Sequence, residues 1–129
     1  MTKKSTLSRP TSGELEILRV LWHRGRSTVR DVHEALRERR VGYTTVLKLL
    51  QIMTEKGLVK RDESERAHVY EVRVPQEQTE TQLVRDLVDR AFGGSPGRLV
   101  MQALSSRKAT PEERDRIRQL LDELEGEGQ

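Results

Sequence analysis

Four side chains between positions 43 and 48 have the types and spacing needed to contact the edges of DNA bases. Tyr43, Thr44, Thr45 and Lys48 fall in the first two turns of a predicted helix, on or near the face opposite its apolar residues. A threonine offers a hydroxyl and a methyl group that can contact thymine, and a lysine one turn later suits a guanine edge or a phosphate. A solvated helix face with a threonine cap would use the same residue types, so the surrounding elements must decide between the two interpretations.

Arginines and lysines outside this helix are candidates for contacts with phosphate groups. They lie at the N-terminus (Lys3, Lys4, Arg9), in the preceding helix and in the run that follows it (Arg30, Arg37, Arg39, Arg40). A run of arginines at a helix end also complements the helix dipole, so we expect phosphate contacts from one or two of these residues. With Arg66 in a later hairpin, the predicted DNA-contacting set is Tyr43, Thr44, Thr45, Lys48, Arg30, Arg40 and Arg66.

The charges are distributed unevenly along the chain. Residues 1–75 contain 16 Lys+Arg and 10 Asp+Glu, a net charge of +6, whereas residues 76–129 contain 8 and 11, a net charge of −3. A basic half joined to a mildly acidic half suggests that the first half meets a polyanion and that the second has another task.

Residues for catalysis or metal binding are not arranged in any pattern that supports such chemistry. There is no cysteine, and His23, His33 and His68 lack the spacing of a metal site. No nucleophile elbow or glycine-rich phosphate loop is present. We therefore expect no enzyme activity, no cofactor and no metal; His68 is predicted to pack across the hairpin. No apolar run exceeds three residues, which predicts a cytoplasmic protein without membrane insertion.

The first half of the chain has the element order of a winged helix-turn-helix. Thr11 and Glu14 have the spacing of a capping box that opens a helix ending at Gly25. A second helix begins near Thr28, and a third covers residues 43–56 and ends at Gly57. Strands are predicted at residues 58–61 and 67–74, joined by a polar turn. Three short helices followed by a hairpin form a winged helix over residues 11–75, preceded by a flexible basic arm at residues 1–10.

The second half, residues 76–129, reads as three helices with apolar stripes. Together with the first half, this predicts a mostly α fold with a small β-hairpin, in which a winged helix precedes an all-α domain. Three helices in about 50 residues make a small core, so we expect a second copy of the chain to complete it. The predicted dimerisation residues are Leu83, Leu87, Val88, Leu120 and Leu124.

Seven short segments carry a specific combination of residues. They are ELEILRVLW at 14–22, STVRDV at 27–32, YTTV at 43–46, EKGLV at 55–59, RAHVY at 66–70, FGG at 92–94 and LV at 99–100. By these segments the chain resembles the penicillinase-repressor (BlaI/MecI/CopY) family of winged-helix transcriptional regulators, from Thr11 to about Leu124. The resemblance implies a repressor that binds a dyad operator in double-stranded DNA as a homodimer.

The resemblance also implies how repression ends. In the family, a protease linked to a membrane sensor cleaves the dimerisation domain shortly after a Leu-Val pair, which corresponds here to the bond between Gln102 and Ala103. The implied partner is a sensor metalloprotease. The best-known members are cleaved at an Asn-Phe bond, so release by a ligand or by another partner stays open.

Three departures from the family pattern change individual expectations. Ile52 stands where many members carry a basic residue, which removes one expected backbone contact. The hairpin turn at residues 62–65 contains three acids and should repel phosphate. The cysteine-rich, copper-sensing tail of one branch is missing, which excludes copper sensing through that tail.

Two other classes of function compete with a DNA-binding repressor. The first is a winged helix used for protein–protein contact, against which the basic first half and the face of Thr44, Thr45 and Lys48 argue. The second is a small enzyme or metal sensor, for which the required nucleophiles and ligands are missing.

Overall fold

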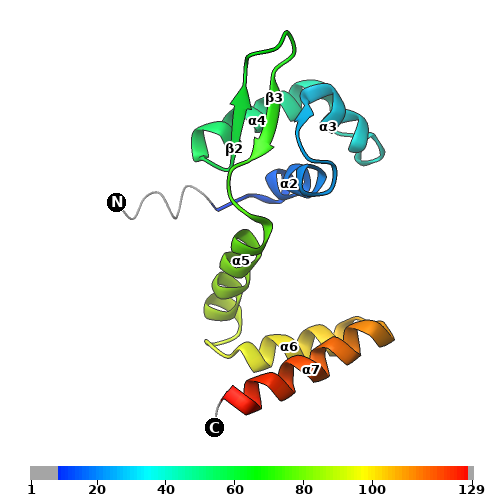
Figure 1. Cartoon of the computed structure of the whole chain (residues 1–129), viewed down its shortest axis with the longest axis vertical. Coiled ribbons are helices and arrows are strands. Elements are labelled where there is room, and N and C mark those ends of the chain that lie inside the picture. Colours follow the sequence, from blue (N-terminus) through cyan, green and yellow to red (C-terminus); the bar gives the residue numbers. More distant parts are fainter. Residues whose placement is uncertain (1–8, 128–129) are drawn as a thin grey trace. The chain divides into compact units, whose positions relative to one another are not determined.

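The computed structural model describes residues 9–127 and is mostly helical with one small sheet, which confirms the predicted fold class (Figure 1). The elements follow in the order α2 (Ser12–Arg24), β1 (Ser27–Thr28), α3 (Val29–Ala35), the 3₁₀ helix η1 (Arg37–Arg39), α4 (Tyr43–Lys56), β2 (Val59–Asp62), β3 (Val69–Val72), α5 (Gln76–Ala91), α6 (Pro96–Ser106) and α7 (Pro111–Glu127). The predicted basic arm at residues 1–10 lies outside the described residues except for Arg9 and Pro10.

Helices α2, α3 and α4 pack around one apolar core, to which the sheet contributes Val59 and Tyr70. The buried side chains recur at helical spacing on one face of each helix, as the sequence pattern predicts. They are Ile17, Leu18 and Leu21 from α2, Val29 and Val32 from α3, and Val46, Leu50 and Met53 from α4. This core holds the outer face of α4 at a fixed position on the surface.

The sheet has three strands in the order β1-β3-β2, one more than the predicted hairpin. β1 contains only Ser27 and Thr28, which pair antiparallel with Tyr70 and Val69 of β3. Two residues are too few to show an alternating pattern, so periodicity could not have revealed this strand. Its pairing joins the β2–β3 hairpin to the start of α3.

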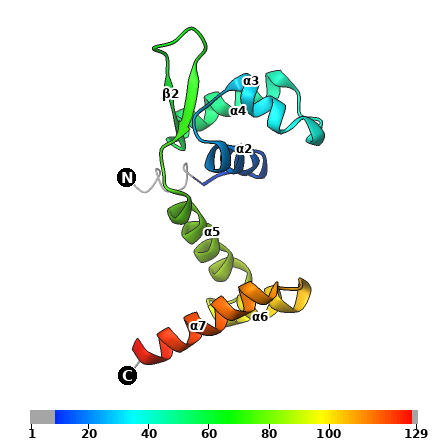
Figure 2. The same cartoon turned by 45° about the vertical axis from the view of Figure 1, so that its right-hand side comes forward.

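Strand β3 begins later than predicted, which corrects one expectation. It covers Val69–Val72 rather than residues 67–74, so Ala67 and His68 belong to the turn. The His68 side chain is exposed, and the prediction that it packs across the hairpin is wrong. The turn between β2 and β3 extends away from the three helices in both views (Figures 1 and 2).

Side-chain caps open four of the described helices, α2, α3, α6 and α7. The Thr11 hydroxyl accepts from the Glu14 N–H while the Glu14 carboxylate accepts from the Thr11 N–H, which confirms the predicted capping box of α2. Thr110 and Glu113 form the same exchange before α7. Gly57 ends α4 with a φ of 83°, a left-handed conformation that favours glycine.

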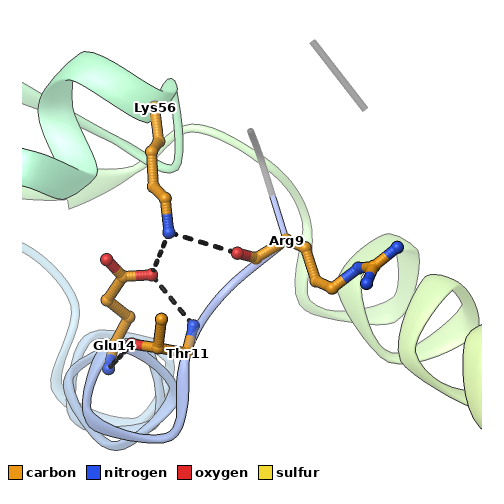
Figure 3. Close-up of polar contacts among 4 residues, drawn as sticks. All are labelled: Arg9, Thr11, Glu14 and Lys56. Atoms are coloured by element: carbon orange, nitrogen blue, oxygen red, sulfur yellow. Dashed lines mark hydrogen bonds and ion pairs between the residues drawn. The ribbon is translucent and has the colours of Figure 1, made fainter. Parts of the chain in front are cut away.

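An ion pair between the buried Glu14 and the partly buried Lys56 connects the start of α2 to the end of α4, as Figure 3 shows. The Lys56 Nζ donates to Glu14 Oε1 at 2.7 Å and to the carbonyl oxygen of Arg9 at 3.2 Å. The Glu14 side chain is only 2% exposed, and its carboxylate accepts hydrogen bonds from Lys56 and from the N–H of Thr11 in place of water. Glu14 therefore caps α2 and also fixes α4 against it.

The chain divides into two compact units, and the division falls inside α5. The first unit extends to Leu83, eight residues beyond the predicted boundary at Pro75, and the second begins at Val84. Thr79 in the first turns of α5 is buried, which agrees with its place in the first unit. Two turns of α5 thus belong to the winged helix.

Most apolar side chains of the second unit remain exposed. Helices α6 and α7 lie side by side in both views (Figures 1 and 2). The large exposed apolar residues of this unit are Val84, Leu87, Val100, Met101, Leu104, Leu120, Leu121 and Leu124. Among the described residues, no helix has the length and apolar character required to cross a membrane.

Candidate nucleic-acid interface

The start of α4 presents the predicted reading residues to the surface. Thr44, Thr45 and Lys48 are exposed, and Tyr43 is 49% exposed, whereas Val46 on the opposite face is fully buried. The N-cap is Gly42, which forms no side-chain cap, and the first turn carries no acid. The free backbone N–H groups and the positive end of the helix dipole make this surface favourable for an anion.

Residues from three elements surround an open hollow of about 540 Å³ beside these side chains. α3 contributes Arg30, α4 contributes Tyr43, and the turn before β3 contributes Arg66 and His68. The Tyr43 ring meets His33 edge-on, with 5.8 Å between ring centroids and 80° between ring planes. The structure therefore brings three of the predicted residues together, and it adds His68, which sequence reasoning had assigned to packing.

The cations of the first unit fall into two groups, according to whether a carboxylate lies within ion-pair distance. Among the described residues, the paired cations are Arg24, Arg26, Arg37, Arg39, Lys56, Lys60 and Arg61. The predicted DNA-contacting cations Arg30, Arg40, Lys48 and Arg66 have no such ion pair, a property shared by Arg19 and Arg73. An unpaired guanidinium or ammonium group can bind phosphate without first breaking an ion pair.

Two of the three acids in the hairpin turn are paired with arginines. Asp62 accepts from Arg26 at 2.7 Å and also from the Ser64 N–H, and Arg61 lies 2.6 Å from Glu63. The Ser64 N–H is the main cause that lowers the pKa of Asp62, followed by Arg26. The Tyr70 hydroxyl, followed by Glu63, raises the pKa of Arg61. This pairing weakens the phosphate repulsion that the sequence predicts and leaves Glu65 as its main source.

A capping box like that of α2 holds Arg30 at the start of α3. The Thr28 hydroxyl accepts from the Asp31 N–H at 3.1 Å, and the Asp31 carboxylate accepts from the Thr28 N–H at 3.0 Å. The bond from the Thr28 backbone is the main cause that lowers the pKa of Asp31. Because Thr28 also pairs with β3, this cap connects Arg30 to the hairpin that carries Arg66.

The predicted dimerisation residues differ in how much surface they offer. Leu87, Leu120 and Leu124 are each about half exposed, and Leu83 is partly buried. Val88 is only 7% exposed within the single chain, so it has little surface to give to a partner. Dimerisation through the other four residues stays a prediction.

The predicted cleavage bond lies within α6. Gln102 and Ala103 are exposed but helical, in the second half of Pro96–Ser106. A protease binds its substrate in an extended form, so α6 would have to unwind locally before the bond could be cut.

Two ion pairs that hold the interface together could not be found from the sequence. Glu14–Lys56 and Arg26–Asp62 join residues 42 and 36 positions apart, and no local spacing relates their members. Within residues 9–127, no group of three or more His, Cys, Asp or Glu side chains could hold a metal ion.

The three-helix core, the three-stranded sheet and the exposed start of α4 define a winged helix-turn-helix protein. A family model described as "Penicillinase repressor" matches residues 10–123, and the chain belongs to the penicillinase repressor family. Two curated relatives, both called "Transcriptional regulator BlaI" and both from Mycobacterium tuberculosis, are 47% identical over 62 residues. The match covers 45% of this chain and 45% of each relative, so it spans less than half of their length.

The comparison with solved structures found two that align with much of this chain. The solution structure of the DNA binding domain of the repressor BlaI is 20% identical, with a TM-score of 0.49, over 54% of this chain and 87% of that chain. A mutant of Lactococcus lactis ZitR in its apo form is 21% identical, with a TM-score of 0.42, over 100% of this chain and 89% of that chain.

Proposed function

We propose that the protein is a DNA-binding transcriptional repressor that acts as a homodimer on a dyad operator. The observation that carries this proposal is that Arg30 and Arg66 lie around one hollow with Tyr43 at the start of α4, whose next turn exposes Lys48. Arg30, Lys48 and Arg66 come from three different elements and have no carboxylate within ion-pair distance among the described residues. Family membership supports the same conclusion.

In this proposal α4 enters the major groove with its N-terminal end toward the base pairs. Thr44, Thr45 and Lys48 contact base edges, since they are the exposed side chains of the first two turns. Arg30 and Arg66 flank the hollow beside Tyr43 and contact the phosphate backbone on either side. Arg40 at the end of η1, with a left-handed φ of 57°, is a further phosphate contact.

In this proposal the second unit forms the dimer interface. Its leucines Leu87, Leu120 and Leu124 are about half exposed, and their burial against a second copy would stabilise a dimer. Two joined winged helices gain affinity for a dyad site because binding of the first raises the effective concentration of the second. Cleavage between Gln102 and Ala103 by a sensor-linked metalloprotease would remove this gain without altering the DNA-contacting face.

DNA binding can be tested without knowing the operator, by selecting sites from random duplexes and measuring affinity for the selected site. We expect a dyad site whose affinity falls steeply with salt, because bound Lys and Arg release counterions. The Thr44→Ala/Thr45→Ala/Lys48→Ala variant should lose specific binding, whereas Lys60→Ala, which removes a cation paired with Glu71, should retain it. Equal affinity of the triple variant and the wild type would refute the proposal.

Cleavage has a separate test. Mass spectrometry of the protein from cells in which the regulated gene has been induced should show fragments that end at Gln102 or begin at Ala103. An intact chain at full derepression would rule out the proteolytic release and favour a ligand or another partner.

A further inference from the structure

The hollow beside the start of α4 is lined by guanidinium and aromatic side chains and by no carboxylate. It receives Arg30 from α3 and Tyr43 from α4, and the hairpin adds Arg66, His68 and Tyr70. Among the described residues that line it, none is an Asp or a Glu. The hollow therefore offers two permanent positive charges and no negative charge to a group that enters it.

His68 is the residue of this lining whose charge can change near neutral pH. Its side chain is exposed, and it forms no ion pair within residues 9–127. An imidazole ordinarily takes up a proton near pH 6.5, whereas arginine stays charged and tyrosine stays neutral throughout that range. Protonation of His68 therefore raises the positive charges around the hollow from two to three.

The acids of the surrounding elements lie outside this hollow. In the part of the chain described, those of the hairpin and of the start of α3 are bound to other partners: Asp62 to Arg26, Glu63 to Arg61, Glu71 to Lys60 and Asp31 to Thr28. Glu65 in the turn has no such partner, but it does not line the hollow. The other titratable neighbour is His33, whose ring meets Tyr43 edge-on. The charges that share the hollow with His68 are thus positive, and an anion from outside would balance them.

We propose that one phosphate group of the DNA backbone enters this hollow and that His68 takes up a proton from water as it does so. This inference rests on the DNA binding of the proposed function, to which it adds His68 and the proton. The phosphate oxygens accept from Arg30, Arg66 and the imidazolium ring, as charge-assisted hydrogen bonds. A backbone phosphate stays singly charged throughout the neutral range, so the proton resides on the ring.

Uptake of a proton makes DNA binding depend on pH in a definite direction. Because the complex holds a proton that the free protein holds less often, affinity rises as the pH falls. Well below pH 6 the free protein is protonated already, and well above pH 8 the complex is not, so the change is confined to the range between. We expect affinity for the selected site to be on the order of fivefold higher per winged helix at pH 6 than at pH 8.

Two replacements of His68 test this linkage in the full-length chain. His68→Gln keeps a neutral polar group, so its affinity should match that of the wild type at pH 8 and should not rise at pH 6. His68→Lys carries its charge throughout this range and should bind about as tightly at pH 8 as at pH 6. Since the side chain is exposed, neither change disturbs the core. Fluorescence anisotropy of the labelled duplex, at constant ionic strength, measures all three proteins.

The other two histidines of the chain provide matched controls. His23 belongs to α2 and does not line the hollow, and His33 contacts Tyr43 from outside the lining. His23→Gln and His33→Gln should both retain the rise in affinity at pH 6. A rise that disappears in either control and survives in His68→Gln would assign the proton to another residue and overturn the proposal.

The salt dependence distinguishes a phosphate contact from an indirect effect on the fold. At pH 6 the wild type should release about one more counterion per winged helix than at pH 8, which steepens the fall of affinity with salt. His68→Gln should show the same slope at both pH values. A purely structural role of His68 would change affinity without changing the difference between the two slopes.

The remaining outcomes separate this inference from the proposed function. Specific binding with equal affinity at pH 6 and pH 8 would overturn the role of His68, while DNA recognition through α4 would stand. Absence of specific binding at both pH values would overturn the two together.

Discussion

The two units of this chain differ in how far their apolar side chains are buried. In the first unit, leucines and valines of three helices are buried in one core together with Tyr70 of the sheet. In the second unit, Val88 alone of the described apolar residues is buried, and the leucines of α7 are about half exposed. The first unit stabilises itself and holds a fixed surface, whereas the second requires cover from outside.

This difference in burial suits a regulator that must release its DNA when a signal arrives. A self-sufficient first unit keeps the start of α4 in place whether or not a partner is present. A second unit that depends on association can be disabled by one event, such as a cut in α6, and the affinity that two linked winged helices gain for a dyad site is then lost. The predictions that follow test this division of roles, from the largest expected effect to the smallest.

The double variant Leu87→Asp/Leu120→Asp should have the largest effect. Two charges per chain on the exposed apolar surface oppose its burial, so we expect monomers by sedimentation. Affinity for the complete operator should fall by roughly 10² to 10⁴, while weak half-site binding is retained. Gln119→Asp, which changes an exposed residue on the other side of α7, serves as the control and should leave the dimer intact. A double variant that still forms dimers would place the interface elsewhere.

Removing a buried ion-pair partner in the first unit should cost far more stability than removing an exposed one in the second. Lys56→Met leaves the Glu14 carboxylate buried without its cation, and should lower the free energy of unfolding by about 3 kcal/mol. Arg90→Met removes an exposed partner of Asp86 and should cost less than about 0.5 kcal/mol. Urea unfolding of both variants gives the comparison, and similar losses would contradict it.

DNA recognition should depend on unpaired cations of the first unit and not on those of the second. Lys48→Ala and Thr45→Ala should each cost about 1–3 kcal/mol of specific binding. Arg107→Ala, at the exposed C-cap of α6, should leave operator affinity unchanged within error. Titrations against the selected site at two salt concentrations measure these differences, and an equal loss from Arg107→Ala would mean that the second unit also contacts DNA.

The smallest expected effect is a pH dependence from the cap of α3. The folded-state pKa of Asp31 is lowered, so its contribution to stability is complete above the unfolded pKa of about 3.9 and is lost as the pH falls through the folded value. Asp31→Asn should therefore be less stable than the wild type at pH 7, by about 1 kcal/mol, and nearly equal to it at pH 2. A difference that persists unchanged at pH 2 would assign the effect to packing.

Much of the secondary structure could be predicted from local sequence. The helical spacing of Leu18, Leu21 and their neighbours, the Thr11–Glu14 box and Gly57 place the helices near their observed bounds. The exposed position of Thr44, Thr45 and Lys48 followed from the same periodicity, because the buried face of a helix fixes its opposite face. These features depend on interactions within a few residues, which a single sequence contains.

The tertiary structure alone decided which charged residues are free. Local sequence does not distinguish Lys48 from Lys56, yet Lys56 is held by Glu14 from another helix and Lys48 has no acid within ion-pair distance in the part of the chain described. The strand β1, the pairing of Asp62 with Arg26 and the position of His68 beside Tyr43 depend on contacts between distant segments. Residue types and periodicity therefore determined the elements and the side of α4 that faces outward. Only folding, by bringing distant charges within a few ångströms, determined which cations have ion-pair partners and which are available to bind DNA.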